Sequence, residues 1–368
     1  MTTPTQPKPA APPAISAPAA PGFWVESWRR FRRRKLALTA FCFVVLLALT
    51  ALFSPAIVGT KPVVCKYKGK LYFPAMSYFN PRWENEIFFR DGFRMRYAQN
   101  LKEKDPQSWA VWPLVYQDPY RRVREGEWPG HPGNGSYAAP NRHNLFGTTH
   151  PGVDVLAQMV HGTRIALLVG FVATGIAALI GITVGALAGY LGGKVDMLLS
   201  RVIEMVMCIP ALVLILALLA VLDTPTIWHL MAVLGLTGWT GIARLTRGEF
   251  LKLRQTEYVT AARALGAGGV RIMLRHILPN SLAPVLVPIS FGIAAAILVE
   301  SDLSFLGFGA PPPNPSWGTL LNAGRSNLQM WWLIVFPGLA VFLTVLAYNL
   351  IGEGIQEATD PKLRQGRK

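Results

Sequence analysis

The stretch "EYVTAARALGAGGVRIMLRHILPN", residues 257–280, decides the fold of this 368-residue chain. It separates two apolar runs, yet it is too polar to cross a bilayer. Its first nine residues predict a short helix, in which Ala261 and Ala262 leave one side almost bare, and Gly266 ends it. A helix with such small side chains suits close contact with a separate protein. The alternative is an ordinary loop between two membrane helices.

The composition is typical of a membrane protein, because 51% of the residues are hydrophobic and only 15% are charged. A formal net charge of +16 could indicate nucleic acid binding. In so apolar a chain it instead favours basic loops that orient membrane helices, so no nucleic acid partner is predicted. The three cysteines form neither a disulfide framework nor a zinc-binding spacing, and we expect no metal site.

Six apolar segments are long enough to cross about 30 Å of hydrocarbon. They lie at 36–58, 165–191, 200–222, 226–243, 282–303 and 332–352, and the fourth is the shortest. The basic cluster "RRFRRRK" precedes the first segment and should remain in the cytoplasm, so six crossings return the C-terminus to the same side. The predicted fold class is therefore an all-α integral membrane protein with six transmembrane helices and cytoplasmic termini.

Two regions flank the first predicted transmembrane helix at 36–58. Residues 1–22 are rich in Pro and Ala and predict a disordered cytoplasmic tail. Residues 23–35 place Trp24, Trp28 and Phe31 at helical spacing beside arginines, which predicts an interfacial amphipathic helix in contact with membrane lipid. The simpler alternative is a basic cluster that only stops translocation.

Residues 59–160 form a long insert after the first segment, and the six-span count places it outside the membrane, in the periplasm. Long loops cross the membrane regardless of their charge. Aromatic residues, prolines and mixed charges, as in "YFNPRWENEIFF", favour a small ordered subdomain, and the alternative is an unstructured insert.

Glycines recur at every fourth position in the second segment, at Gly181, Gly185 and Gly189. Small residues at this spacing let another helix approach closely within lipid. The pattern predicts tight helix packing, either within the bundle or against a partner subunit.

The 257–280 stretch resembles the cytoplasmic EAA-type loop of binding-protein-dependent ABC importer permeases, although Thr260 stands where the general motif has glutamate and His276 where it has isoleucine. The resemblance implies a coupling loop at 244–281 whose helix docks into a groove of the ATP-binding subunit. The residues expected to make this contact are Glu257, Tyr258, Ala261, Ala262, Leu265 and Gly266.

Three further stretches resemble the peptide and nickel branch of the same family. They are "LFGTTHPGVDVLAQMVHGTRIALLVG" (145–170), "ESDLSFLGFGAPPPNPSWGTLL" (300–321) and "YNLIGEGIQEATDPKLR" (348–364). One span, a large insert and five more spans are the arrangement of its C-type subunit, and the long insert most resembles the permease of the microcin C-type peptide importer. The resemblance implies a type I ABC importer permease fold, with the ABC transmembrane type-1 domain at 161–356 and a cytoplasmic tail at 357–368.

For this family the resemblance implies a bacterial inner-membrane, multi-pass permease subunit that forms half of the path for peptides or peptide-like solutes. The implied partners are a second, paralogous permease subunit, two ABC ATP-binding domains and a periplasmic solute-binding protein. The chain has no G-x-x-x-x-G-K-[ST] loop, so we expect no bound cofactor and no catalytic residue, with ATP and Mg acting on partner subunits. The alternatives are a stand-alone secondary transporter or channel, or a membrane anchor for an external enzymatic subdomain.

Two acidic residues near the outer end of the fifth segment are the candidates for a translocation path. A carboxylate at Glu300 should face a partner or a water-filled path, where it could contact the amino group of a peptide. It could equally accept a hydrogen bond that holds the following loop. Asp302 adds a second acid on a different helix face.

Overall fold

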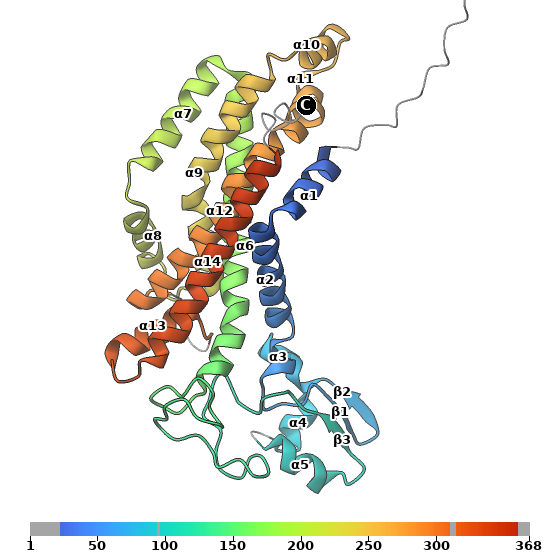
Figure 1. Cartoon of the computed structure of the whole chain (residues 1–368), viewed down its shortest axis with the longest axis vertical. Coiled ribbons are helices and arrows are strands. Elements are labelled where there is room, and N and C mark those ends of the chain that lie inside the picture. Colours follow the sequence, from blue (N-terminus) through green and yellow to red (C-terminus); the bar gives the residue numbers. More distant parts are fainter. Residues whose placement is uncertain (1–22, 94–95, 310–313, 360–368) are drawn as a thin grey trace, which may run out of the picture.

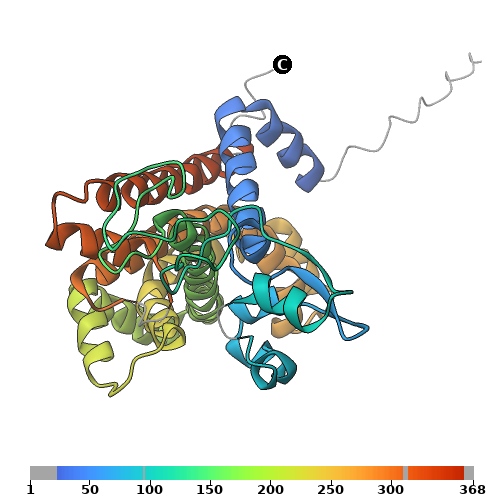
Figure 2. The ribbon, with the colours of Figure 1, turned by 90° about the horizontal axis from the view of Figure 1, so that it is seen from below.

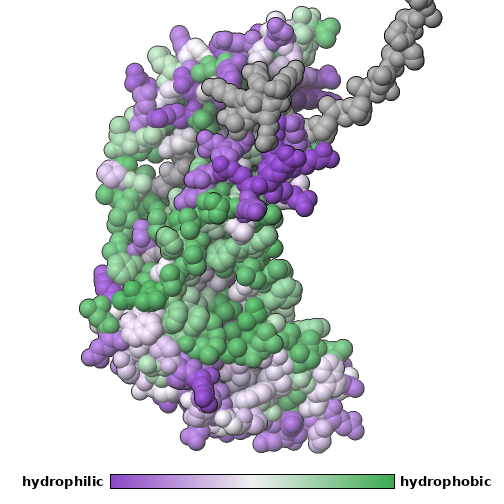
Figure 3. Space-filling model, viewed as in Figure 1, coloured by the Kyte–Doolittle hydropathy of each residue, from purple (hydrophilic) through white to green (hydrophobic). Residues whose placement is uncertain are grey.

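The computed structural model describes residues 23–93, 96–309 and 314–359. The tail predicted at 1–22 and most of that at 357–368 lie outside the described residues. The described part is an elongated helical bundle with a small folded subdomain at one end (Figure 1). A band of apolar side chains crosses the middle of the face seen in Figure 3, and more polar surface lies at both ends.

Four helices of 27 to 37 residues build the bundle. They are α6 (Val155–Leu191), α9 (Ile227–Leu253), α12 (Leu278–Leu306) and α14 (Trp332–Thr359). Seen from below, α6 runs through the middle of the bundle (Figure 2), where it contacts both α9 and α12. Apolar side chains of these helices fill the spaces between them, so the packing of the bundle rests on the central position of α6.

The N-terminal part of the chain packs on the outside of this bundle. Helix α1 (Phe23–Arg33) carries most of the predicted basic cluster, and α2 (Lys35–Leu52) follows it after a bend at Arg34. Both helices contact α14 near its C-terminal end, where the side chain of Phe31 is buried against Ala37 and Gly354. Of the helix predicted at 23–35, residues 23–33 are helical, and the inner face of this helix is covered by protein.

The glycines of α6 meet α9 directly. A Cβ atom added at Gly185 would lie 2.4 Å from the carbonyl oxygen of Ala243, and one at Gly189 would lie 2.6 Å from that of Arg247. At Gly181 the added atom would lie 2.8 Å from the Cβ of Ile242. The predicted close approach is confirmed, and the approaching helix belongs to the same chain.

The third predicted segment, 200–222, is wrong as a single helix. It is replaced by α7 (Gly193–Met207) and α8 (Ala211–Ala220), which meet at an angle of 84°. Pro210 lies in the break, and proline lacks an N–H and disfavours helical backbone in the preceding residue. Neither piece alone reaches the length of about 20 residues that a membrane crossing needs.

The structure does not confirm all six predicted membrane spans. Within the described residues, four helical stretches are long and apolar enough to cross a membrane: α2, α6, Gly269–Leu306 and α14. The bent α7 and α8 pair would make a fifth if it is counted as one span. Helix α9 is long enough at 27 residues, but it does not belong to this apolar set.

A short helix that the sequence did not predict, α13 (Trp317–Ser326), precedes α14. It begins with a capping box, in which the Ser316 hydroxyl accepts from the Thr319 backbone N–H at 3.2 Å and the Thr319 hydroxyl accepts from that of Ser316 at 3.1 Å. The indole of Trp317 is buried and donates to the carbonyl oxygen of Met159 at 3.1 Å. This bond ties α13 to α6.

The insert contains a folded subdomain with a small β-sheet, so the described chain is mostly, but not entirely, helical. Its sheet has the order β2 (Lys70–Tyr72), β1 (Val64–Tyr67), β3 (Trp109–Val111), and both pairs are antiparallel. Short helical turns complete it: α3 (Ser54–Ile57), η1 (Pro74–Tyr78), η2 (Pro81–Trp83), α4 (Glu86–Arg90) and α5 (Tyr97–Lys104). The core holds Cys65, Tyr67, Phe88, Phe93, Tyr97 and Leu101.

The insert is fixed to the start of α6 by polar contacts. The Nε2 atom of His161 lies 2.9 Å from the carbonyl oxygen of Val58. The guanidinium of Arg164 donates to the carbonyl oxygens of Tyr78 at 3.2 Å and Phe79 at 2.9 Å. These bonds join the subdomain to the bundle at the end opposite to α10 (Glu257–Ala264), as Figure 1 shows.

Candidate functional site

The predicted docking helix is present as α10 (Glu257–Ala264), which lies at the end of the bundle remote from the insert (Figure 1). Its one fully buried side chain, Val259, packs against Phe250, Ile272 and Ile277. Each helical residue turns by about 100°, so Ala261 lies about 200° from Val259, on the opposite face. The helix is therefore anchored by one side and presents the side of Ala261 outward.

The end of α10 follows from its glycine. Gly266 has φ +84°, a left-handed conformation that glycine adopts without steric cost. Its N–H donates to the carbonyl oxygen of Arg263 at 3.0 Å, and the N–H of Ala267 donates to that of Ala262 at 3.1 Å. This pair of bonds is the Schellman motif, which satisfies carbonyl groups that the helix end would leave unpaired.

Five of the six residues predicted for the docking contact share the exposed surface of α10. Leu265 has an exposed fraction of 88% and Tyr258 of 41%. Glu257, Ala261 and Gly266 are exposed as well. Ala262 departs from the prediction, because it packs inward against the cluster around Val259 and is only half-exposed.

The loop that carries α10 is tied to the membrane helices on its N-terminal side. The guanidinium of Arg254, just after α9, donates to the carbonyl oxygens of Gly189 at 3.2 Å and Tyr190 at 3.3 Å, at the end of α6. The guanidinium of Arg247 forms an ion pair with Asp196 of α7. These contacts join the end of α9, just before α10, to α6 and α7.

On the C-terminal side, α10 leads through α11 (Gly269–Arg271) and a π-helical turn, η3 (Ile272–Ile277), directly into α12. The buried side chains of this turn, Ile272 and Ile277, also hold Val259. π-Helical turns inside longer helices are rare and occur frequently at functional sites. The sequence did not predict this turn, which continues into α12, while residues 265–268 form a short non-helical connection between α10 and α11.

The two predicted path residues lie in different environments. Glu300 has no exposed surface, and its Oε1 atom accepts a hydrogen bond from the Ser304 hydroxyl at 2.7 Å. The Ser304 hydroxyl oxygen in turn lies 3.2 Å from that of Ser316, the cap of α13. Asp302 is exposed and turned away from this chain of contacts. The structure therefore does not bring the two carboxylates together.

A cavity of about 250 Å³ lies between the helices α6, α8, α9 and α12. Small residues line much of it, among them Gly238, Gly241 and Gly292, together with Thr174 and Thr237. Its walls carry no charged side chain. This cavity could not be predicted from the sequence, because its lining comes from four separate helices.

Similarity to known proteins agrees with the loop motif. Residues 181–365 match the family described as binding-protein-dependent transport system inner membrane component. Residues 22–69 match the N-terminal TM domain of oligopeptide transport permease C, which covers α1 and α2.

Several known proteins are similar to this chain over most of its length. The peptidoglycan transport system permease protein YejE of Agrobacterium fabrum is 32% identical over 355 residues, covering 91% of this chain and 92% of that protein. The inner membrane ABC transporter permease protein YejE of Escherichia coli is 35% identical, covering 91% and 96%. The dipeptide transport system permease protein DppC of Bacillus subtilis is 40% identical, covering 61% and 71%. The family predicted from the 257–280 loop is thus confirmed, and the chain belongs to the inner membrane components of binding-protein-dependent transport systems, within the C-type permeases of ABC importers.

Proposed function

We propose that this permease forms half of the transmembrane path of an ATP-driven importer for peptides or peptide-like solutes. The substrate class rests on its relatives, which are described as dipeptide and peptidoglycan transport permeases. ATP hydrolysis resides on separate subunits in this family, and membership of a binding-protein-dependent family argues against a stand-alone transporter. The microcin C-type substrate implied by the length of the insert stays a prediction.

The observation that carries the proposal is the exposed face of α10 around Ala261. This surface combines the small side chain of Ala261 with the exposed apolar side chain of Leu265, whose burial against a partner would be favourable. We infer that an ATP-binding subunit covers it and that closure of two such subunits moves α10 together with α6, α9 and α12. In an alternating-access cycle this movement would open the path to a solute-binding protein on the side of the insert.

The proposed orientation places α1, α10 and the C-terminal end of α14 in the cytoplasm and the insert in the periplasm. Two features support it. These three elements gather at one end of the bundle and the insert lies at the other (Figure 1). Arginines are concentrated in α1, before the first apolar helix, where the positive-inside rule expects the cytoplasm.

For Glu300 we propose a bracing function. A fully buried carboxylate bonded to Ser304, which touches the cap of α13, holds the end of α12 against α13. A residue that meets solute should have an exposed atom on a path, and Glu300 has none. The cavity between α6, α8, α9 and α12 is the better candidate for a solute-facing wall, completed by a second permease.

The docking proposal is tested by Ala261→Asp, with Ala261→Ser as the matched control. An unpaired carboxylate in a buried contact costs about 3–5 kcal/mol, or a loss of affinity of about 150-fold or more. The affinity-tagged full-length chain should co-purify with ATP-binding subunits from its host. The aspartate variant should reach the membrane but lose these subunits and peptide uptake, while the serine variant keeps both. Co-purification and uptake of Ala261→Asp at the normal level would remove the coupling function from α10.

A further inference from the structure

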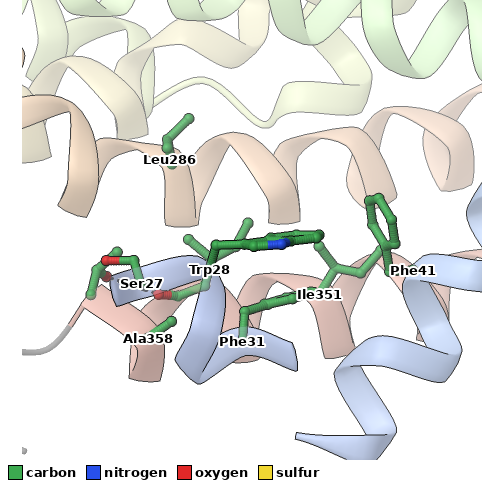
Figure 4. Close-up of a pocket in the computed structure, with 9 residues that line it drawn as sticks. Ser27, Trp28, Phe31, Phe41, Leu286, Ile351 and Ala358 are labelled. Carbon is green, nitrogen blue, oxygen red and sulfur yellow. Dashed lines mark hydrogen bonds between the residues drawn. The ribbon is translucent and has the colours of Figure 1, made fainter. Parts of the chain in front are cut away.

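A second site lies at the opposite side of the bundle from the α7 and α8 pair, where α1 and α2 meet α12 and α14. Here a groove of about 260 Å³ is lined almost entirely by apolar side chains (Figure 4). Trp28 and Phe31 reach into it from α1, Phe41 closes one end from α2, and Leu286 and Ile351 line it from α12 and α14. We call it the α1 groove.

The aromatic walls of the α1 groove are rigidly arranged. Trp28 stacks on Phe31 with ring centroids 5.7 Å apart, and Phe41 meets both rings edge-on, at 5.8 Å and 6.2 Å. Phe31 is buried, whereas Trp28 keeps an exposed fraction of 47%. One large aromatic surface is therefore left partly uncovered by the described residues.

Three arginines lie beside this uncovered ring. Arg29, Arg32 and Arg33 are spaced so that they share one face of α1, and Arg32 lies about 40° around the helix from Trp28. All three are exposed. Among the described residues they form no ion pair, while the neighbouring Arg30 and Arg34 are paired with Glu26 and Glu357. The three arginines that form no ion pair among the described residues therefore lie along the edge of α1 that borders the apolar groove.

The position of this edge at the border of the apolar band indicates which kind of ligand the α1 groove would bind. In Figure 3 the strongly polar surface of α1 borders directly on the apolar band of the bundle. A ligand that reaches both would have a negative group at the border and a hydrocarbon part within the band.

We propose that the α1 groove binds an anionic phospholipid, with one acyl chain against Trp28 and Phe41 and the phosphate group on Arg29, Arg32 and Arg33. The bound lipid covers the exposed indole and neutralises arginines that form no ion pair with the described residues. It would hold α1 against α14 at the same end of the bundle as α10. This inference does not depend on the transported solute or on the ATP-binding subunits.

Lipids with brominated acyl chains test the site, because bromine quenches nearby tryptophan. The purified full-length chain is placed in phosphatidylcholine nanodiscs that contain a minor fraction of brominated phosphatidylglycerol or brominated phosphatidylcholine. The chain has 11 tryptophans, so the Trp28 signal is the difference between the native protein and Trp28→Phe. Brominated phosphatidylglycerol should quench this signal at a much lower fraction than brominated phosphatidylcholine.

Two variants separate a groove site from diffuse attraction. Replacing Arg29, Arg32 and Arg33 by Gln should lower the preference for phosphatidylglycerol by about fivefold per arginine. Ile355→Phe fills the groove while leaving every charge in place, and it should abolish the preference. Leu346→Phe, on the same helix but outside the groove, should leave it intact.

Three results would overturn the proposal. Equal quenching by the two lipids would show that the arginines select no anionic lipid. A preference that survives Ile355→Phe would show that anionic lipid is attracted diffusely and not held in the groove. Loss of quenching once the companion subunits co-purify with the chain would show that protein covers this surface.

Discussion

Gly185→Ala should lower the free energy of unfolding of the bundle, by an amount that follows from the contacts of Gly185. The added methyl carbon would lie 2.4 Å from the carbonyl oxygen of Ala243, about 0.9 Å closer than the ~3.3 Å at which such atoms normally meet. It would also lie 2.7 Å from the Cβ of Thr246. Because backbone and not a flexible side chain is in the way, α6 and α9 must separate, and contacts at Gly181 and Gly189 are lost with them.

Overpacking of this kind typically costs about 1–3 kcal/mol. Alanine is also the better helix former, by about 0.5–1 kcal/mol, which offsets part of the cost. Gly175→Ala on the same helix separates the packing cost from the gain in helix propensity, since nothing lies within 4 Å of its added Cβ. The free energy of unfolding should therefore differ between the two variants by about 1–3 kcal/mol, with Gly175→Ala the more stable.

The assay is unfolding of the purified full-length chain in mixed micelles by increasing fractions of SDS, followed by tryptophan fluorescence. Both variants carry the same chemical change, so differences in expression or helix propensity cancel. Equal unfolding free energies for Gly185→Ala and Gly175→Ala would refute the packing of α9 on the glycine face of α6. A loss in both variants relative to the native chain would point instead to lipid or subunit contacts at the exposed Gly175.

Three further predictions address orientation, bracing and acid stability. In a background without native cysteines, a cysteine at Glu103 should react with a membrane-impermeant thiol reagent in intact cells and one at Gly268 only after lysis; the reverse pattern would contradict the proposed orientation. Glu300→Gln should lower the amount of assembled protein and reduce uptake of free and amino-acetylated peptides equally, whereas a selective loss of free peptides at normal assembly would place the carboxylate on the path. Hydrogen bonds from Lys68 and Tyr67 lower the pKa of the Asp91 carboxyl, so its contribution to insert stability is present above the ordinary aspartate pKa and is lost as the pH falls through the lower folded value. Asp91→Asn should flatten the loss of thermal stability below pH 4, and an unchanged acid dependence would exclude this contribution.

The sequence by itself determined the features that depend on local chemistry. The apolar runs predicted four of the helices long enough to cross a membrane, because length and hydropathy are properties of a single segment. Helix α10 and its end at Gly266 were predictable, since glycine is the residue that ends helices in a left-handed conformation. The spacing of Gly181, Gly185 and Gly189 predicted a close helix contact.

Only the tertiary structure decided which surfaces meet. The glycine spacing could not say whether α9 or another subunit fills it, because a small-residue face accepts any helix of matching shape. The hydropathy of residues 200–222 could not predict the 84° bend between α7 and α8. Pro210 permits this bend, but only the packing of the two helices in the bundle requires it. Glu300 appeared equally suited to solute contact and to bracing, until α13 placed Ser316 beside Ser304 and left the carboxylate without exposed surface. The length, polarity and helix-breaking residues of a segment can be read from that segment alone. The burial of its side chains and the contacts that they make depend on residues far away in the chain.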